Sequence, residues 1–261
     1  MKQSMEVEMI SCNQNCRHCY AHGKYNEYIM SLDFLKNIYT QFHKVIGDDL
    51  VLDIAYLIHE ITNHPQFFEI LSWLKDNFNN SNKLVTNGYK IGSDRTFAEE
   101  LLEKEISSYQ LTLYGINETH NNFAGSKKSF TNIMSAIKFL SKNNRDISIN
   151  IILHRGMLNE IPDIINYLSR FDICMSDINW VSPAPIGNSE NDNWRIRKRD
   201  LKDFNDLFDD MKGLEYLMSE QEIIKTIHRE KNEINVQDVK KQNSEKPKKK
   251  KIKIPLPKIT V

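Results

Sequence analysis

Two spacings of apolar residues alternate along the first 211 residues of the chain. Short apolar or alternating runs, typical of β-strands, cover residues 5–10, 50–58, 83–86, 107–114, 146–153 and 176–182. Helical spacing covers residues 32–45, 65–78, 94–104, 130–142, 159–168 and 200–211. In the second helix, for example, Phe67, Leu71 and Leu74 fall on one face.

This regular alternation of strands and helices predicts parallel strands joined by right-handed crossovers. Six such units are too few for a closed eightfold barrel. We therefore predict an α/β fold with an open, three-quarter (β/α)6 barrel similar to a TIM barrel. It would occupy residues 1–213, followed by a C-terminal helical extension at 214–239 and a Lys-rich, disordered tail at 240–261.

The composition is that of an ordinary globular protein, with 40% hydrophobic and 27% charged residues. No apolar run is long enough to span a membrane, and the N-terminus lacks the apolar stretch of a signal peptide. Only four cysteines are present, and three of them are close together, which argues against a disulfide scaffold. Reduced thiols that bind metal indicate a cytoplasmic protein, and we expect no membrane partner.

The net charge of zero hides an uneven distribution. Residues 240–261 contain nine lysines and one glutamate, a charge of +8, so the part before them carries about −8. An acidic body does not attract nucleic acid. We therefore expect no nucleic-acid partner, apart from weak binding through the basic tail.

The strongest chemical signal follows the first strand, where Cys12, Cys16 and Cys19 have the spacing C-x3-C-x2-C. Thiolates select zinc, copper(I) or iron–sulfur clusters. Three ligands without a fourth cysteine nearby favour a cluster with one iron left open. A zinc-binding module completed by His18 or His22 is the alternative from the same residues.

The cysteine loop resembles the signature of the radical S-adenosylmethionine (radical SAM) superfamily, and segments downstream resemble other parts of that family's pattern in the same order. These are Glu60 with His64 and Pro65, then Thr86-Asn87-Gly88, then residues 111–115 with Glu118, Thr119 and His120, and finally Asn159. The resemblance covers residues 5–188. Because Cys174 is the single cysteine outside the loop, it implies a core domain without an auxiliary-cluster domain.

The resemblance implies two cofactors, a [4Fe–4S] cluster held by the three cysteines and SAM bound to the open iron. Reduction would split SAM to a 5′-deoxyadenosyl radical, which abstracts hydrogen from an unidentified small-molecule or peptide substrate. The electron would come from a low-potential donor of the flavodoxin or ferredoxin type.

The resemblance also assigns cofactor-binding residues. Glu60 would meet the methionine ammonium group, and His18 would lie beside the adenine. Polar side chains at strand ends would bind the ribose or the carboxylate: Thr86, Asn87, Thr112 and Asn159. The resemblance identifies no catalytic side chain, although His64 and His120 lie in loops from which they could donate protons.

The sequence departs from the family pattern at the second strand. Ile58 and His59 stand where the family usually has two glycines, and Ile61 stands where proline is usual. Glycine allows a backbone to approach a ligand closely. A non-catalytic or degenerate cluster-binding relative is therefore the main alternative to an active enzyme.

Overall fold

The computed structural model describes residues 2–19, 28–78, 82–171, 173, 178–181 and 194, with only the backbone at 178–181. All of them belong to one compact unit, Met1–Leu217. The predicted helix at 200–211, the extension at 214–239 and the Lys-rich tail lie outside the described residues, as do His22 and Cys174.

The paired strands of the described residues are all parallel. They are β1 (Gln3–Ser4), β2 (Val7–Glu8), β3 (Leu50–Val51), β4 (Leu57–Ile58), β5 (Lys83–Thr86), β6 (Ser108–Leu113), β7 (Ile147–Ile152) and β8 (Ile178–Val181). The first four form the pairs β1–β3 and β2–β4, and the last four form one sheet in the order β5-β6-β7-β8. Strand β5 contacts the short helical turn η2 (Ile54–Tyr56), which lies between β3 and β4.

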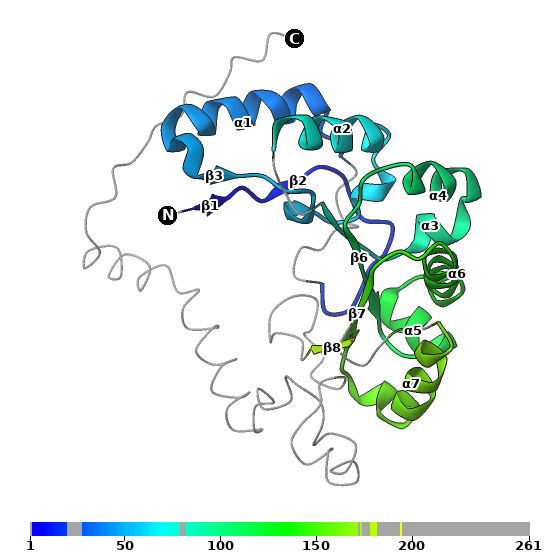
Figure 1. Ribbon diagram of the computed structural model, residues 1–261. Coiled ribbons are helices and arrows are strands. Elements are labelled where there is room, and N and C mark those ends of the chain that lie inside the picture. Colours follow the sequence, from blue (N-terminus) through cyan, green and yellow to red (C-terminus); the bar gives the residue numbers. More distant parts are fainter. Residues whose placement is uncertain are drawn as a thin grey trace, which may run out of the picture. The chain divides into compact units, whose positions relative to one another are not determined.

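Helices connect the strands and cover one side of them (Figure 1). The α-helices are α1 (Leu32–Ile46), α2 (Phe67–Asn77), α3 (Tyr89–Ser93), α4 (Arg95–Leu102), α5 (Asn117–Ala124), α6 (Ser129–Lys142) and α7 (Ile161–Ser169). Three further short turns are η1 (Gly47–Asp49), η3 (Ile61–Asn63) and η4 (Arg155–Glu160). The parallel strands with helical crossovers confirm the predicted partial-barrel α/β fold.

Some predicted boundaries were wrong. The predicted strand at 50–58 is interrupted by η2, because the Asp53 carboxylate caps that turn by accepting the Ala55 N–H at 3.0 Å. The predicted strand at 5–10 is likewise divided into β1 and β2. Helices α3 and α5 were not predicted, since short helices offer too few residues for a clear helical period.

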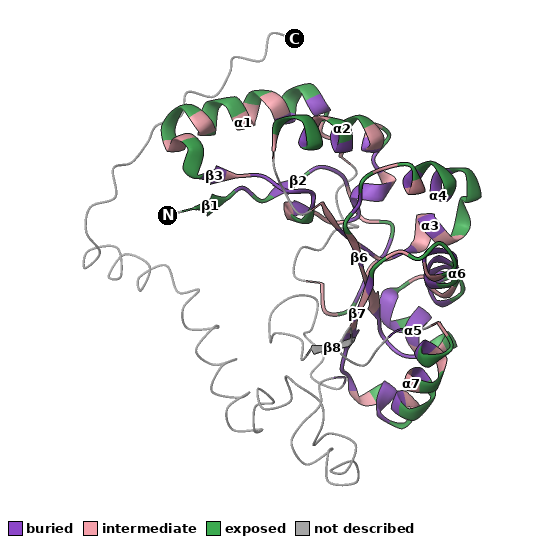
Figure 2. Cartoon of the chain, viewed as in Figure 1, coloured by how far each residue is buried: buried purple, intermediate pink, exposed green. Residues whose placement is uncertain are grey.

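The hydrophobic core lies between the strands and the helices. On β6, Tyr109, Leu111 and Leu113 are buried and belong to this core. Helices are buried on the side that faces the strands and exposed on the other (Figure 2). Because side chains alternate along a strand, the residues between these three point to the opposite face of the sheet.

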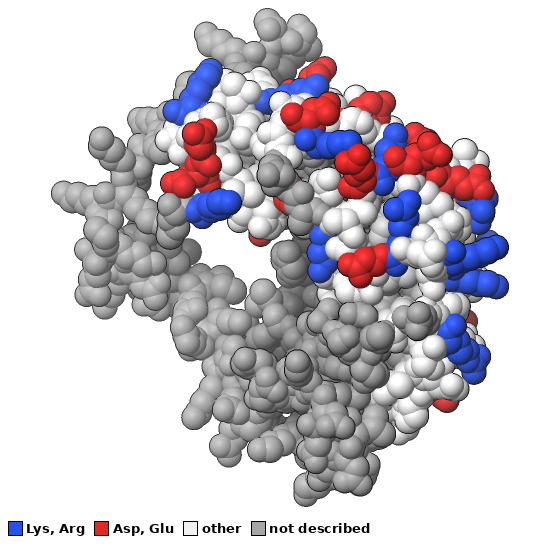
Figure 3. Space-filling model, in the orientation of Figure 1, with Lys and Arg blue, Asp and Glu red and all other residues white. Residues whose placement is uncertain are grey.

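The outer faces of the helices are charged. Basic and acidic side chains are intermixed in the view of Figure 3, so neither sign dominates this surface. Within the described residues, no helix has the length and apolar character needed to cross a bilayer.

Candidate active site at the cysteine loop

The cysteine loop follows β2 and is held against the end of α5. The Asn15 N–H donates to the Ala124 carbonyl, and the Arg17 N–H donates to the Phe123 carbonyl, both at 3.0 Å. Cys16 is buried, whereas Cys12 and Cys19 are partly exposed, and all three are free thiols. The loop is therefore fixed by backbone hydrogen bonds that do not involve the cysteine side chains.

Burial raises the pKa of Cys12 and of Cys16 to about 12, and the Glu60 carboxylate raises the pKa of Cys12 further. Thiols in such surroundings keep their protons until a cation replaces them, because metal binding requires the thiolate. The loop thus has the electrostatics of a site that a positively charged metal group would stabilise.

The described residues contain no three His, Cys, Asp or Glu side chains arranged around one metal ion. A zinc module needs its ligands to converge on a single ion, whereas a cluster with four irons binds its thiolates on different irons. A zinc site made by the cysteines and His18 is therefore not formed in this structure, and His22 lies outside the described residues.

Glu60 is the buried acidic group of the site, only 2% exposed. Its carboxylate accepts hydrogen bonds from the Thr62 hydroxyl at 2.5 Å, the Thr86 hydroxyl at 2.6 Å and the Asn87 N–H at 2.6 Å. Burial raises the pKa of Glu60, and these three donors oppose that rise. Glu60 is consequently held in one orientation.

Asn87 connects this carboxylate to the cysteine loop. Its side-chain amide donates to Asn13 Oδ1 at 2.8 Å and lies 3.9 Å from Cys12 Sγ. The structure thereby brings together Glu60, Thr86 and Asn87 with the first cysteine, although these residues are far apart in the sequence.

His18 packs against aromatic rings behind the loop. Its ring centroid is 5.3 Å from that of Tyr114 and 5.7 Å from that of Phe123. Burial, followed by the neighbouring His154, lowers the pKa of His18 to about 4. Its Nδ1 is buried without a hydrogen-bond partner among the described residues, so a polar atom of a ligand could satisfy it.

Two predicted residues lie apart from these contacts. Thr112 is half-buried on β6, and Asn159 is exposed in η4. The adjacent Glu160, which sequence reasoning missed, accepts hydrogen bonds from the Thr119 hydroxyl at 2.5 Å and the Ile116 N–H at 2.7 Å. No sequence signal distinguishes Glu160 from the other acidic residues of the chain.

The suggestion that His64 and His120 donate protons to a substrate is not supported. Each is 1% exposed. His64 bonds the Met30 carbonyl through Nε2 and accepts the Gln66 N–H at Nδ1. His120 contacts the Ser129 hydroxyl and the Tyr114 N–H. Both rings are thus occupied by structural hydrogen bonds.

The face of the sheet opposite the helices is polar. Gln110 and Thr112 on β6 stand in register with Ser148 and Asn150 on β7, and all four are half-buried. The Ser148 hydroxyl is buried and has no hydrogen-bond partner among the described residues. This face offers hydroxyl and amide groups rather than apolar surface.

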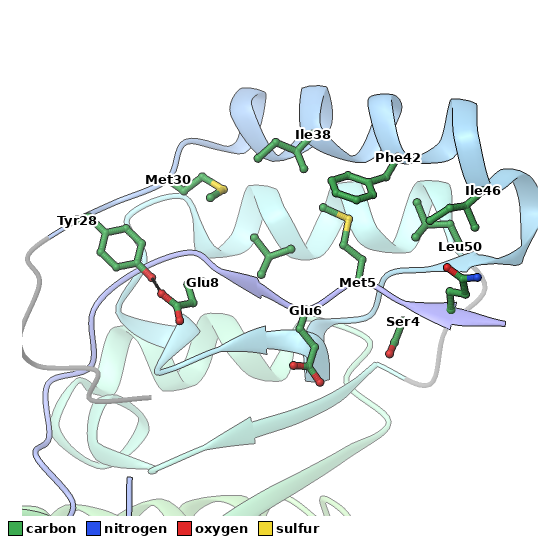
Figure 4. Close-up of a pocket in the computed structure, with 12 residues that line it drawn as sticks. Ser4, Met5, Glu6, Glu8, Tyr28, Met30, Ile38, Phe42, Ile46 and Leu50 are labelled. Atoms are coloured by element: carbon green, nitrogen blue, oxygen red, sulfur yellow. Dashed lines mark hydrogen bonds between the residues drawn. The ribbon is translucent and has the colours of Figure 1, made fainter. Parts of the chain in front are cut away.

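Two cavities lie near these elements. One of about 420 Å³ adjoins the cysteine loop and is lined by Arg17, Phe123, His154 and Trp194, among others. Another of about 580 Å³ lies between α1 and the β1–β2 segment, and no cysteine lines it. Figure 4 shows Met5 pointing toward α1 there and Glu6 pointing away from it. The first cavity is therefore the one next to the candidate site.

Comparison with protein families gives a match to the family model described as the Radical SAM superfamily over residues 9–168. The chain is 26% identical to the Fe-coproporphyrin III synthase of Methanosarcina barkeri over 161 residues, 60% of this chain and 38% of that protein. It is 28% identical to the antilisterial bacteriocin subtilosin biosynthesis protein AlbA of Bacillus subtilis over 179 residues, 65% and 37% of the two chains. The chain thus spans less than two fifths of these relatives.

Solved structures share the fold. Native anSMEcpe with bound AdoMet and a peptide superposes with a TM-score of 0.59 at 20% identity, over 79% of this chain and 58% of that one. Streptococcus suis SuiB bound to the precursor peptide SuiA gives 0.59 at 14% identity, over 79% and 45%. These comparisons confirm the resemblance inferred from the cysteine loop and the segments downstream of it.

Proposed function

The chain belongs to the radical SAM superfamily, and from this we propose that it is an enzyme that cleaves SAM reductively and abstracts hydrogen from a substrate. Members of the superfamily use a [4Fe–4S] cluster and SAM. When bound and reduced by a low-potential flavodoxin or ferredoxin, the cluster supplies the electron that splits SAM into methionine and the 5′-deoxyadenosyl radical.

The residues of the site fit these cofactors. Cys12, Cys16 and Cys19 would hold three irons. The Nδ1 of His18 has no hydrogen-bond partner within the described part of the chain, so it is available to the adenine. Glu60 would accept from the methionine ammonium group through the remaining lone pairs of its carboxylate, a charge-assisted bond.

The observation that carries this proposal is the position of Glu60. The altered residues Ile58 and His59 precede it, yet Glu60 is anchored by Thr86 and Asn87, and Asn87 reaches the cysteine loop. A degenerate relative would have no need to keep a buried carboxylate beside the thiols, because burying a charged group is unfavourable. The anchored carboxylate therefore favours an active enzyme over a non-catalytic relative.

We further propose that the substrate is a peptide. The half-buried hydroxyl and amide groups of β6 and β7 are donors and acceptors of the kind that pair with a peptide backbone. Two of the similar structures hold a peptide, as their names say, and one relative is a bacteriocin biosynthesis protein.

The test of the first proposal is anaerobic reconstitution of the full chain with iron and sulfide, followed by addition of dithionite and SAM. We expect about four irons per chain and formation of 5′-deoxyadenosine, measured by mass spectrometry. Cys16→Ala should lose both, whereas Cys174→Ala, which changes the cysteine outside the loop, should keep both.

Other outcomes would contradict it. Four irons without 5′-deoxyadenosine under any reductant would establish a non-catalytic relative, and one bound zinc without iron would establish a zinc module. For the substrate class, peptides deuterated at carbon should transfer deuterium into 5′-deoxyadenosine. Transfer from deuterated small molecules but from no peptide would exclude the peptide proposal.

A further inference from the structure

A row of buried polar side chains lies behind the cysteine loop. Cys16 Sγ is 3.5 Å from Gln14 Oε1, Gln14 Nε2 is 2.8 Å from Ser129 Oγ, and Ser129 Oγ is 2.9 Å from His120 Nε2. Gln14 is 2% exposed, and Ser129 and His120 are each 1% exposed. Buried polar groups contribute most when every donor meets an acceptor, so the direction of these bonds matters.

The direction is fixed at the histidine end. The Tyr114 N–H donates to His120 Nδ1 at 3.2 Å, so Nδ1 is an acceptor and the ring proton must be on Nε2. Burial lowers the pKa of His120 to about 3, which keeps the ring neutral with one N–H. His120 therefore donates to Ser129 Oγ, and the hydroxyl hydrogen of Ser129 is left to point toward Gln14.

The Gln14 amide can present either of its ends to Ser129, because its oxygen and nitrogen occupy equivalent positions. With Cys16 as a thiol, the sulfur donates to Oε1, and both Gln14 and His120 donate to the one oxygen of Ser129. The hydroxyl hydrogen of Ser129 then meets no acceptor in this row. A thiolate at Cys16 reverses the preference, because it can only accept.

We propose that Gln14, Ser129 and His120 form a directed hydrogen-bond relay that ends on the Cys16 thiolate, with the Gln14 amide turned so that its NH₂ group faces the sulfur of the loaded cluster. His120 then donates to Ser129, Ser129 to Gln14, and Gln14 to Cys16. Every donor in the row has an acceptor in this arrangement. The proposal rests on the proposed function, since it requires that Cys16 binds the cluster.

Such a relay has a functional consequence. Hydrogen bonds to cluster sulfurs are among the factors that set the reduction potential of an iron–sulfur cluster. A donor favours the reduced cluster because that state places more negative charge on the sulfurs. Gln14 is thus a positioning residue that makes the cluster easier to reduce, and Ser129 and His120 hold its amide in the required orientation.

The test is a redox titration of the reconstituted full chain without SAM, followed by electron paramagnetic resonance. Gln14→Leu keeps the approximate size of the side chain and removes the donor. We expect the ratio of reduced to oxidised cluster at a fixed potential to fall roughly tenfold, a shift of about 59 mV to lower potential for one electron. Ser129→Ala should shift it in the same direction. Ser126→Ala, in the same turn between α5 and α6, is the matched control and should leave it unchanged.

The outcomes separate this inference from the proposed function. A wild-type protein that holds no iron–sulfur cluster would refute the function, whereas a bound cluster whose potential is unmoved in both Gln14→Leu and Ser129→Ala would refute the relay alone. If Gln14→Leu fails to retain iron, Ser129→Ala decides. A coupling to the Gln14 amide nitrogen in pulsed spectra of the reduced wild type, absent from Ser129→Ala, would support the turned amide directly, and its absence from the wild type would overturn it.

Discussion

His59 shows how one residue can replace a glycine and keep the glycine's backbone. Its φ is +71°, in the left-handed region that disfavours side chains. The imidazole is only 3% exposed, with Nε2 3.7 Å from a Glu8 carboxylate oxygen that also accepts the Tyr28 hydroxyl at 2.9 Å. The next residue, Glu60, is therefore presented to the site along the path a glycine would allow, at the expense of local strain.

This strain can be measured by comparing two variants that both remove the imidazole. His59→Gly should be more stable than His59→Ala by about 1 kcal/mol, because only glycine relaxes at positive φ, while its greater freedom in the unfolded chain offsets part of the gain. Urea denaturation of the unloaded protein gives the difference in free energy of unfolding.

Ala55→Gly in the neighbouring turn η2 is the matched control. Ala55 has no positive φ, so glycine there should lower the stability rather than raise it. If the His59→Ala protein proved as stable as the His59→Gly protein, the backbone at this position would carry no strain in solution.

At the scale of elements, α5 and the cysteine loop depend on each other. Gly125 ends α5 in the left-handed conformation, with φ +64°. A Cβ there would lie 2.8 Å from the Asn15 carbonyl oxygen, closer than such atoms approach. The end of α5 and the loop can be this close only because residue 125 has no side chain.

We therefore expect Gly125→Ala to lower both the stability and the iron content of the reconstituted protein, since the loop must move away from α5. Gly47→Ala is the matched control, because Gly47 also has a positive φ, +70°, but a Cβ there meets nothing within 4 Å. Both substitutions should cost about 1–3 kcal/mol of strain. Iron analysis after desalting distinguishes them, and equal iron content in the two variants would contradict the role assigned to Gly125.

At the scale of the whole molecule, the charge distribution leads to a prediction about the tail. Deletion of residues 240–261 should leave the melting temperature and the formation of 5′-deoxyadenosine nearly unchanged, because a segment with nine lysines has too little apolar surface to pack. Thermal unfolding and product analysis of the full and shortened chains provide the measurement. A large fall in melting temperature would show instead that Ile252, Ile254 and Leu256 pack against the barrel.

Local patterns carried much of the fold. The spacing of apolar residues predicted the parallel α/β fold and placed β5 at its observed bounds, because burial on one face imposes a period that can be read along the chain. The interruption of the second strand by η2 was not visible in that period, since it depends on one capping carboxylate, Asp53. The cysteine spacing likewise identified the superfamily without any knowledge of the fold.

The sequence by itself thus determined the fold class, the superfamily and the three candidate ligands, because each is encoded within a few adjacent residues. Only the tertiary structure decided which distant side chains meet. Gln14 and Ser129 are 115 positions apart and share a buried hydrogen bond, and Glu60 is joined to Asn87 across 27 positions. No local period records such pairs, since they arise when packed helices and strands bring separate segments together and burial then requires each polar group to find a partner.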